Sequence, residues 1–203
     1  MIENAGNDTL VRPSLTLIVM FENVPALEAF GVPDKRPVLD VGRASGPIAP
    51  ATKHSRRDVR VTGLDVSPRA LEQARVNEGL VMGTLDSGVR WVQSRWFEAL
   101  AGERFDLIVS NPPYVRTAEI VGPLTFEPQL ALDGGADGLA AYRVLLAEAP
   151  SHLSAGGALL VEHGADQRAE LVALGEQHGW RVALAHDDLG GPPRVLELER
   201  RTA

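Results

Sequence analysis

The sequence contains no cysteine, no long apolar run and no excess of basic residues. Without cysteine the chain can form no disulfide, thiolate nucleophile or cysteine-based zinc site, which fits a reducing compartment. The apolar run from Leu15 to Phe21 is far shorter than the ~20 residues of a membrane span, and Glu3 and Asp8 stand where a leader would be basic. A formal net charge of -7 argues against a large phosphate-neutralising surface. We expect a soluble cytoplasmic protein with no membrane partner, and nucleic acid is the less favoured partner.

The 203 residues do provide 44% apolar content, enough for one globular domain with a core. From residue 37 onward, short apolar runs alternate with helical patterns, which predicts an α/β fold with a mostly parallel sheet and helices on both faces. The last two expected strands, 181–185 and 195–200, have no helix between them and predict a C-terminal antiparallel hairpin. Residues 1–36 are less regular, and we expect an N-terminal cover segment there, ahead of a domain at 37–203.

A turn of small residues follows the first expected strand. Val38–Gly42 predicts a buried strand that runs into Gly42-Arg43-Ala44-Ser45-Gly46, and a helix is expected to open at Pro47. A tight turn before a helix N-terminus lets a ligand approach the backbone and presents N–H groups to it. Many such turns only connect two elements, so both interpretations stay open.

The next expected strand, 59–64, ends at Asp65. Ser67 and Pro68 then predict the N-cap and first residue of a helix. An acidic side chain about 20 residues after a glycine turn can accept both hydroxyls of a ribose. The alternative is that Asp65 caps the helix that follows.

The tetrapeptide Asn111-Pro112-Pro113-Tyr114 follows the apolar run 105–110, which predicts a buried strand. Ligands of open α/β sheets bind at the carboxyl ends of strands, and the two prolines fix the backbone there. The Asn111 oxygen and the Pro112 carbonyl can each accept one N–H from a substrate amide or amino group, while the Tyr114 ring packs beside it. The alternative is a plain turn after a strand.

Two further features lie near the same predicted edge. Trp96 comes shortly after the expected strand 89–93 and can flank an adenine, although Trp96 and Phe97 can equally cover a strand end in the core. Residues 115–137 form a long irregular segment rich in Gly and Pro, which is typical of a substrate lid.

Together, Val38–Gly42 with Ser45-Gly46, Leu64–Leu71 and Phe105–Tyr114 resemble class I S-adenosylmethionine-dependent methyltransferases. The later run Phe126–Gly135, with Asp137-Gly138-Leu139 and Tyr142-Arg143, resembles the HemK/PrmC family, which methylates the glutamine amide N5 of peptide chain release factors. The resemblance runs from about Arg12 to the end, and we expect the family's N-terminal helical domain to be absent. It implies a Rossmann-like class I methyltransferase fold with a seven-stranded sheet, S-adenosyl-L-methionine as cofactor, a release factor as substrate and no metal.

By position, the resemblance implies one site with two halves. The cofactor half would comprise Gly42, Arg43, Ala44, Ser45 and Gly46 at the methionine end, Asp65 at the ribose, Trp96 at the adenine, and Asn111. The substrate half would comprise Asn111, Pro112, Pro113 and Tyr114, with Asn111, Pro112 and Tyr114 as the catalytic residues.

Three positions depart from the family pattern: Arg43 and Ala44 in the turn, and Arg95 before Trp96. A methyltransferase-fold binding protein with impaired cofactor use is therefore one alternative. A second is an amino-methyltransferase acting on a nucleobase of DNA or RNA, because the tetrapeptide alone fits such enzymes.

Overall fold

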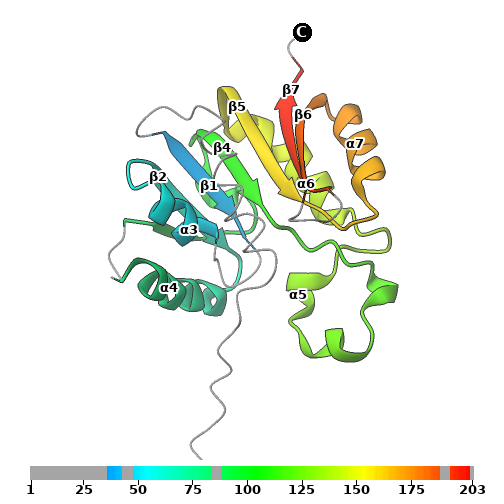
Figure 1. The fold of residues 1–203 in the computed structure, drawn as a ribbon, viewed down its shortest axis with the longest axis horizontal. Coiled ribbons are helices and arrows are strands. Elements are labelled where there is room, and N and C mark those ends of the chain that lie inside the picture. Colours follow the sequence, from blue (N-terminus) through cyan, green and yellow to red (C-terminus); the bar gives the residue numbers. More distant parts are fainter. Residues whose placement is uncertain (1–35, 43–47, 84–87, 188–192, 202–203) are drawn as a thin grey trace, which may run out of the picture.

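The computed structural model describes residues 36–42, 48–83, 88–187 and 193–201, and it is built on a seven-stranded sheet in the order β3-β2-β1-β4-β5-β7-β6 (Figure 1). The neighbouring pairs among the first five strands of that order are parallel, while β7 is antiparallel to both β5 and β6. The strands are β1 (Pro37–Val41), β2 (Arg60–Asp65), β3 (Arg90–Gln93), β4 (Phe105–Ser110), β5 (Leu153–Glu162), β6 (Trp180–Asp187) and β7 (Pro193–Arg200). The predicted mostly parallel sheet and C-terminal hairpin are confirmed.

Helices cover both faces of the sheet, because alternate strand residues point to opposite sides and both sides are apolar. Leu107 packs in a core with Ile48 of α3 (Ile48–Ser55), whereas its neighbour Ile108 packs with Leu145 of α6 (Ala140–His152) and Leu171 of α7 (Arg168–Gln177). No helix of the described residues is long and apolar enough to cross a bilayer.

The helix after β2, α4 (Pro68–Met82), begins as its sequence predicts. Ser67 is the N-cap, and its hydroxyl accepts a hydrogen bond from the backbone N–H of Ala70 at 3.3 Å. Pro68 occupies the first turn, where a missing N–H costs nothing. The helix ends at Gly83, which adopts the left-handed conformation at φ 69°.

The beginning of β5 differs from the prediction. In the sequence, Gly156-Gly157 predicts a turn before a strand at 158–162, but the strand starts at Leu153. Leu153 pairs with Phe105 and Ala158 pairs with Leu107, so residues 154–157 form a bulge inside the strand. A Cβ on Gly157 would stand 3.0 Å from the Asp106 carbonyl oxygen, which is why a residue without a side chain fits there.

The expected irregular segment contains short helices and closes on itself. It holds η2 (Thr117–Glu119), η3 (Gly122–Phe126) and α5 (Gln129–Leu132), which extend away from the sheet in Figure 1. Its two ends meet where Val115 bridges Asp133 and the Thr117 hydroxyl donates to the Asp133 carboxylate at 2.7 Å. The segment therefore leaves and rejoins the domain directly beside Tyr114.

Candidate functional site

Three strand ends meet at the carboxyl edge of the parallel strands. The Gly42 N–H donates to the Leu64 carbonyl at 3.1 Å, which joins the ends of β1 and β2. The Ser110 hydroxyl donates to the Val41 carbonyl at 2.7 Å, which joins β4 to β1. The edge thus brings together three predicted site residues. Gly42 follows β1, Asp65 ends β2, and Asn111 follows β4. The other turn positions, Arg43, Ala44, Ser45 and Gly46, lie outside the described residues.

Asp40, the fourth of the five residues of β1, is a buried carboxyl group that the sequence alone did not single out. Its side chain is 2% exposed, and Oδ2 accepts a hydrogen bond from the Ala49 backbone N–H at 2.9 Å. Oδ1 finds no hydrogen-bond partner among the described residues. Burial raises the pKa of Asp40 to about 7; the Ala49 hydrogen bond opposes this shift and the negative charge of Asp65 adds to it. The feature of the sequence that could have revealed Asp40 is an acidic residue inside an otherwise apolar strand.

Asp65 ends β2 and is 3% exposed. Its Oδ1 accepts the backbone N–H of Ser67 at 2.7 Å, so it braces the residue that caps α4 and does not cap that helix itself. A role for Asp65 at a ribose stays a prediction. No group of three or more His, Asp or Glu side chains in the described part of the chain could hold a metal ion.

Trp96 and Phe97 have different environments. Phe97 is 3% exposed and stacks on His152 with ring centroids 4.7 Å apart, so it belongs to the core. Trp96 is half-buried and has φ 51°, the one positive φ of a non-glycine residue among those described. The Ser94 hydroxyl holds this turn by donating to the Trp96 carbonyl at 2.8 Å. A strained backbone of this kind is concentrated at functional sites, so Trp96 remains the candidate beside a cofactor.

The tetrapeptide directly follows β4. Ser110 is fully buried before it, Pro112 and Pro113 are buried, and Asn111 is only partly buried. The Asn111 amide makes no hydrogen bond to other described residues. Its oxygen is an acceptor and its NH₂ carries two donors. The rigid dipeptide and the buried Ser110 hold Asn111 in place from both sides.

The glycines of the later motif pack against Tyr114. A Cβ on Gly134 would lie 2.8 Å from the Tyr114 Cα, and a Cβ on Gly138 would lie 2.5 Å from the Tyr114 carbonyl oxygen. Gly138 also has φ 75°, which side-chain-bearing residues rarely adopt. Asp137 anchors this loop by accepting the Leu139 N–H at 3.0 Å. The Gly-Gly and Asp-Gly-Leu motif therefore shapes the backbone around the tetrapeptide.

Two residues distant in sequence also reach Tyr114. The Gln167 side chain donates to the Tyr114 carbonyl at 2.9 Å, and Arg194 of β7 donates to the Tyr114 hydroxyl at 3.1 Å. Glu162, the last residue of β5, lies beside both Tyr114 and Arg194. The sequence carries no signal for Gln167 or Arg194. Glu162 ends an expected strand, and at that position the sequence favours a structural role over one that faces the site.

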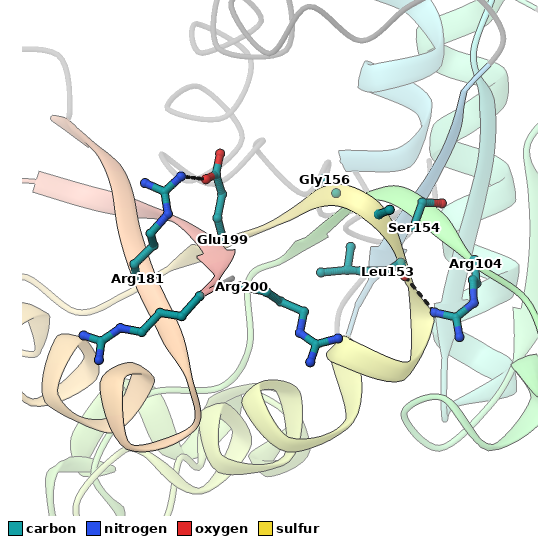
Figure 2. Close-up of a pocket in the computed structure, with 10 residues that line it drawn as sticks. Arg104, Leu153, Ser154, Gly156, Arg181, Glu199 and Arg200 are labelled. Atoms are coloured by element: carbon teal, nitrogen blue, oxygen red, sulfur yellow. Dashed lines mark hydrogen bonds and ion pairs between the residues drawn. The ribbon is translucent and has the colours of Figure 1, made fainter. Parts of the chain in front are cut away.

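A pocket of about 650 Å³ lies at the opposite edge of the sheet, where β5 begins and β7 ends (Figure 2). Arg181 pairs with Glu199 there, and Arg104 donates to the Leu153 carbonyl at 2.8 Å. None of the predicted site residues that the structure describes lines this pocket. The candidate site stays at the carboxyl edge. The lining residues are Arg104, Leu153, Ser154, Ala155, Gly156, Gly157, Arg181, Glu199, Arg200 and Arg201.

Comparisons with known proteins relate the chain to methyltransferases. Residues 24–125 match the model of the methyltransferase small domain. The release factor glutamine methyltransferase of Agrobacterium fabrum is 41% identical in an alignment of 201 positions, which covers 96% of this chain and 68% of that protein. The Geobacter sulfurreducens protein of the same name is 35% identical over 96% of this chain and 69% of its own length. The solved release-factor-specific protein-(glutamine-N5) methyltransferase of Alicyclobacillus acidocaldarius superposes with a TM-score of 0.56 and 27% identity, covering 98% of this chain and 100% of that one.

Proposed function

We propose that this chain transfers a methyl group to the N5 amide nitrogen of a glutamine in a peptide chain release factor. The chain belongs to the family of release factor glutamine methyltransferases. The observation that carries the proposal is the Asn111 amide, held at the carboxyl end of β4 with its hydrogen-bonding groups unused by the described residues. The curated relatives named above are about half as long again as this chain, which spans 68% and 69% of their lengths.

The residues at the carboxyl edge fit S-adenosyl-L-methionine. Gly42 offers a backbone without a side chain at the end of β1, and the buried carboxylate of Asp65 stands at the end of the adjacent β2. These are the groups that bind the amino acid end and the ribose of nucleoside ligands in α/β folds. We assign the adenine side to Trp96 and the remaining methionine contacts to Arg43, Ala44, Ser45 and Gly46. When bound, the cofactor supplies the methyl group.

Asn111 and Pro112 position the acceptor amide. The Asn111 oxygen accepts one N–H of the glutamine NH₂ and the Pro112 carbonyl accepts the other, which leaves the nitrogen lone pair facing the cofactor side. Tyr114 packs against the flat amide group. An amide is a poor nucleophile, so orientation and polarisation of its N–H bonds supply most of the rate enhancement.

The test is methyl transfer to a purified release factor together with calorimetric titration of the cofactor. The parent protein is expected to bind S-adenosyl-L-methionine and to methylate one glutamine. Asn111→Ala is expected to lower transfer by on the order of 10²–10³-fold, the cost of removing one positioned hydrogen-bonding group from an active site. Its cofactor affinity is expected to change only a few-fold.

Asn77→Ala on α4 is the matched control, because it removes the same side chain from a helix away from Asn111 and should retain parental activity. Three results would contradict the proposal. These are unchanged transfer by Asn111→Ala, transfer to DNA or RNA but not to a release factor, and absence of saturable cofactor binding by the parent. The last result would favour a binding protein instead.

A further inference from the structure

Side chains from three separate elements converge beside the acceptor site. Arg194 Nη2 donates to the Tyr114 hydroxyl at 3.1 Å and lies 3.6 Å from Glu162 Oε1, while the Tyr114 hydroxyl is 3.5 Å from that oxygen. The guanidinium carbon of Arg194 also lies 5.8 Å from the centre of the Tyr114 ring. Because β7 is antiparallel to β5, the beginning of β7 reaches the edge at which β5 ends, and this topology brings the three side chains together.

The charges in this cluster differ in burial. The Glu162 side chain is 1% exposed, whereas that of Arg194 is 25% exposed. A buried carboxylate needs a cation and hydrogen bonds, and Arg194 provides the cation. A buried ion pair adds little to stability compared with apolar residues of the same volume, so stability alone does not account for this arrangement.

The backbone of Tyr114 is held as well as its hydroxyl. The Gln167 side chain is 2% exposed, donates to the Tyr114 carbonyl at 2.9 Å and accepts the Gly164 N–H at 3.0 Å. With the carbonyl fixed by Gln167 and the hydroxyl fixed by Arg194, the ring has one orientation. Tyr114 is the residue after Pro113, so its orientation also sets one wall of the acceptor site.

We infer that Arg194, paired with Glu162, is a positioning residue that holds the Tyr114 ring in the orientation required to pack against the acceptor amide. The inference deepens the proposed function and rests on it for the nature of the acceptor. Arg194 touches neither reacting atom in this assignment; it acts through Tyr114.

Tyrosine ionisation provides a direct readout, because the chain has only two tyrosines, Tyr114 and Tyr142. Burial raises the pKa of Tyr114 above 10, the charge of Glu162 raises it further, and Arg194 lowers it. Burial places the pKa of Tyr142 well above 10, so the first tyrosine to ionise should be Tyr114. The two transitions can be followed by tyrosinate absorbance as the pH rises.

Two variants should shift this titration in opposite directions. Arg194→Gln removes the cation and should raise the pKa of Tyr114, while Glu162→Gln removes the anion and should lower it. Arg194→Lys keeps the charge and should restore most of the parental value. Simple loosening of the structure would expose Tyr114 and lower its pKa in both Gln variants, so that result would overturn the inference.

Steady-state kinetics complete the test. Arg194→Gln is expected to lower kcat by roughly 10–100-fold through misplacement of the acceptor, with cofactor affinity within about twofold of the parent. Arg194→Lys should recover part of this loss. Arg200→Gln is the matched control and should leave kcat and the tyrosine titration unchanged, because Arg200 lies at the other end of β7, in the pocket at the opposite edge of the sheet (Figure 2).

An Arg194→Gln protein with parental kcat and a parental tyrosine titration would also refute the inference. Failure of the parent to methylate a release factor would count against the proposed function alone. The titration needs no acceptor, so it would still decide whether Arg194 and Glu162 hold Tyr114.

Discussion

Asp40→Asn is expected to stabilise the protein against unfolding at neutral and alkaline pH. Asp40 is 2% exposed, and its pKa is raised by burial from 3.8 to about 7. Because the folded pKa lies above the unfolded one, folding favours the protonated carboxyl group. The contribution of Asp40 to the free energy of unfolding is therefore fully present below about pH 4 and is lost as the pH rises through 7. Asparagine has the same shape, and its oxygen can still accept the Ala49 N–H.

The size of the effect follows from the two pKa values. The difference between about 7 and 3.8 is roughly three units, and each unit corresponds to about 1.4 kcal/mol. The parent should lose up to about 4 kcal/mol of unfolding free energy between pH 4 and pH 8.5, and the Asn variant should lose none of this part. Relaxation around the charged group makes this an upper limit.

Denaturant unfolding of both proteins at several pH values measures the difference. The advantage of Asn over Asp should grow steadily with pH and level off above pH 8. A difference that stays constant with pH, or an Asn variant less stable than the parent at pH 8.5, would refute this account of the Asp40 environment.

Asp137→Asn is a control of opposite sign. The hydrogen bond from Arg143 lowers the pKa of Asp137 to about 2, so its contribution is present above its ordinary pKa of 3.8 and is lost as the pH falls toward 2. Between pH 5 and 8.5 the Asp137→Asn protein should be slightly less stable than the parent, with no dependence of that difference on pH.

Three further substitutions test a close contact inside the sheet, a helix cap and the backbone beside Tyr114. Gly63→Ala should destabilise the fold by about 1–3 kcal/mol in denaturant unfolding, because the new Cβ would lie 2.3 Å from the Trp91 ring; parental stability would contradict this packing. Ser67→Ala should cost about 1 kcal/mol by removing the N-cap of α4, and an unchanged unfolding midpoint would argue against the cap. Gly138→Ala should lower methyl transfer at least ~10-fold by displacing the Tyr114 backbone, while calorimetry shows cofactor binding within a few-fold of the parent; equal losses in both would indicate general damage.

The elements that the sequence predicts well are those specified by local chemistry. Ser67 and Pro68 define the beginning of α4 through backbone rules that involve only neighbouring residues, and the apolar run before Asn111 fixes the end of β4. The Gly156-Gly157 pair misled the prediction because a bulge and a turn use the same residues, and only the partner strand distinguishes them.

The parts of the site that could not be predicted depend on strand order. Arg194 lies 80 residues after Tyr114 in the sequence. No local pattern between them predicts that β7 pairs with β5 in the antiparallel direction. Trp96 and Phe97 are both aromatic, so the sequence does not distinguish them. Only the fold shows that Phe97 is buried in the core while Trp96 is partly buried against it.

The sheet order β5-β7-β6 also has a consequence for the time course of folding. β7 is the last of the described strands to leave the ribosome, yet it occupies the place between two strands that are made before it. Until β7 arrives, β5 has one unpaired edge and β6 has no neighbour in the sheet, and unpaired edges promote association between chains. Arg194, which holds Tyr114, is part of that same strand. The acceptor site is therefore completed in the same folding step in which β7 pairs with β5 and β6.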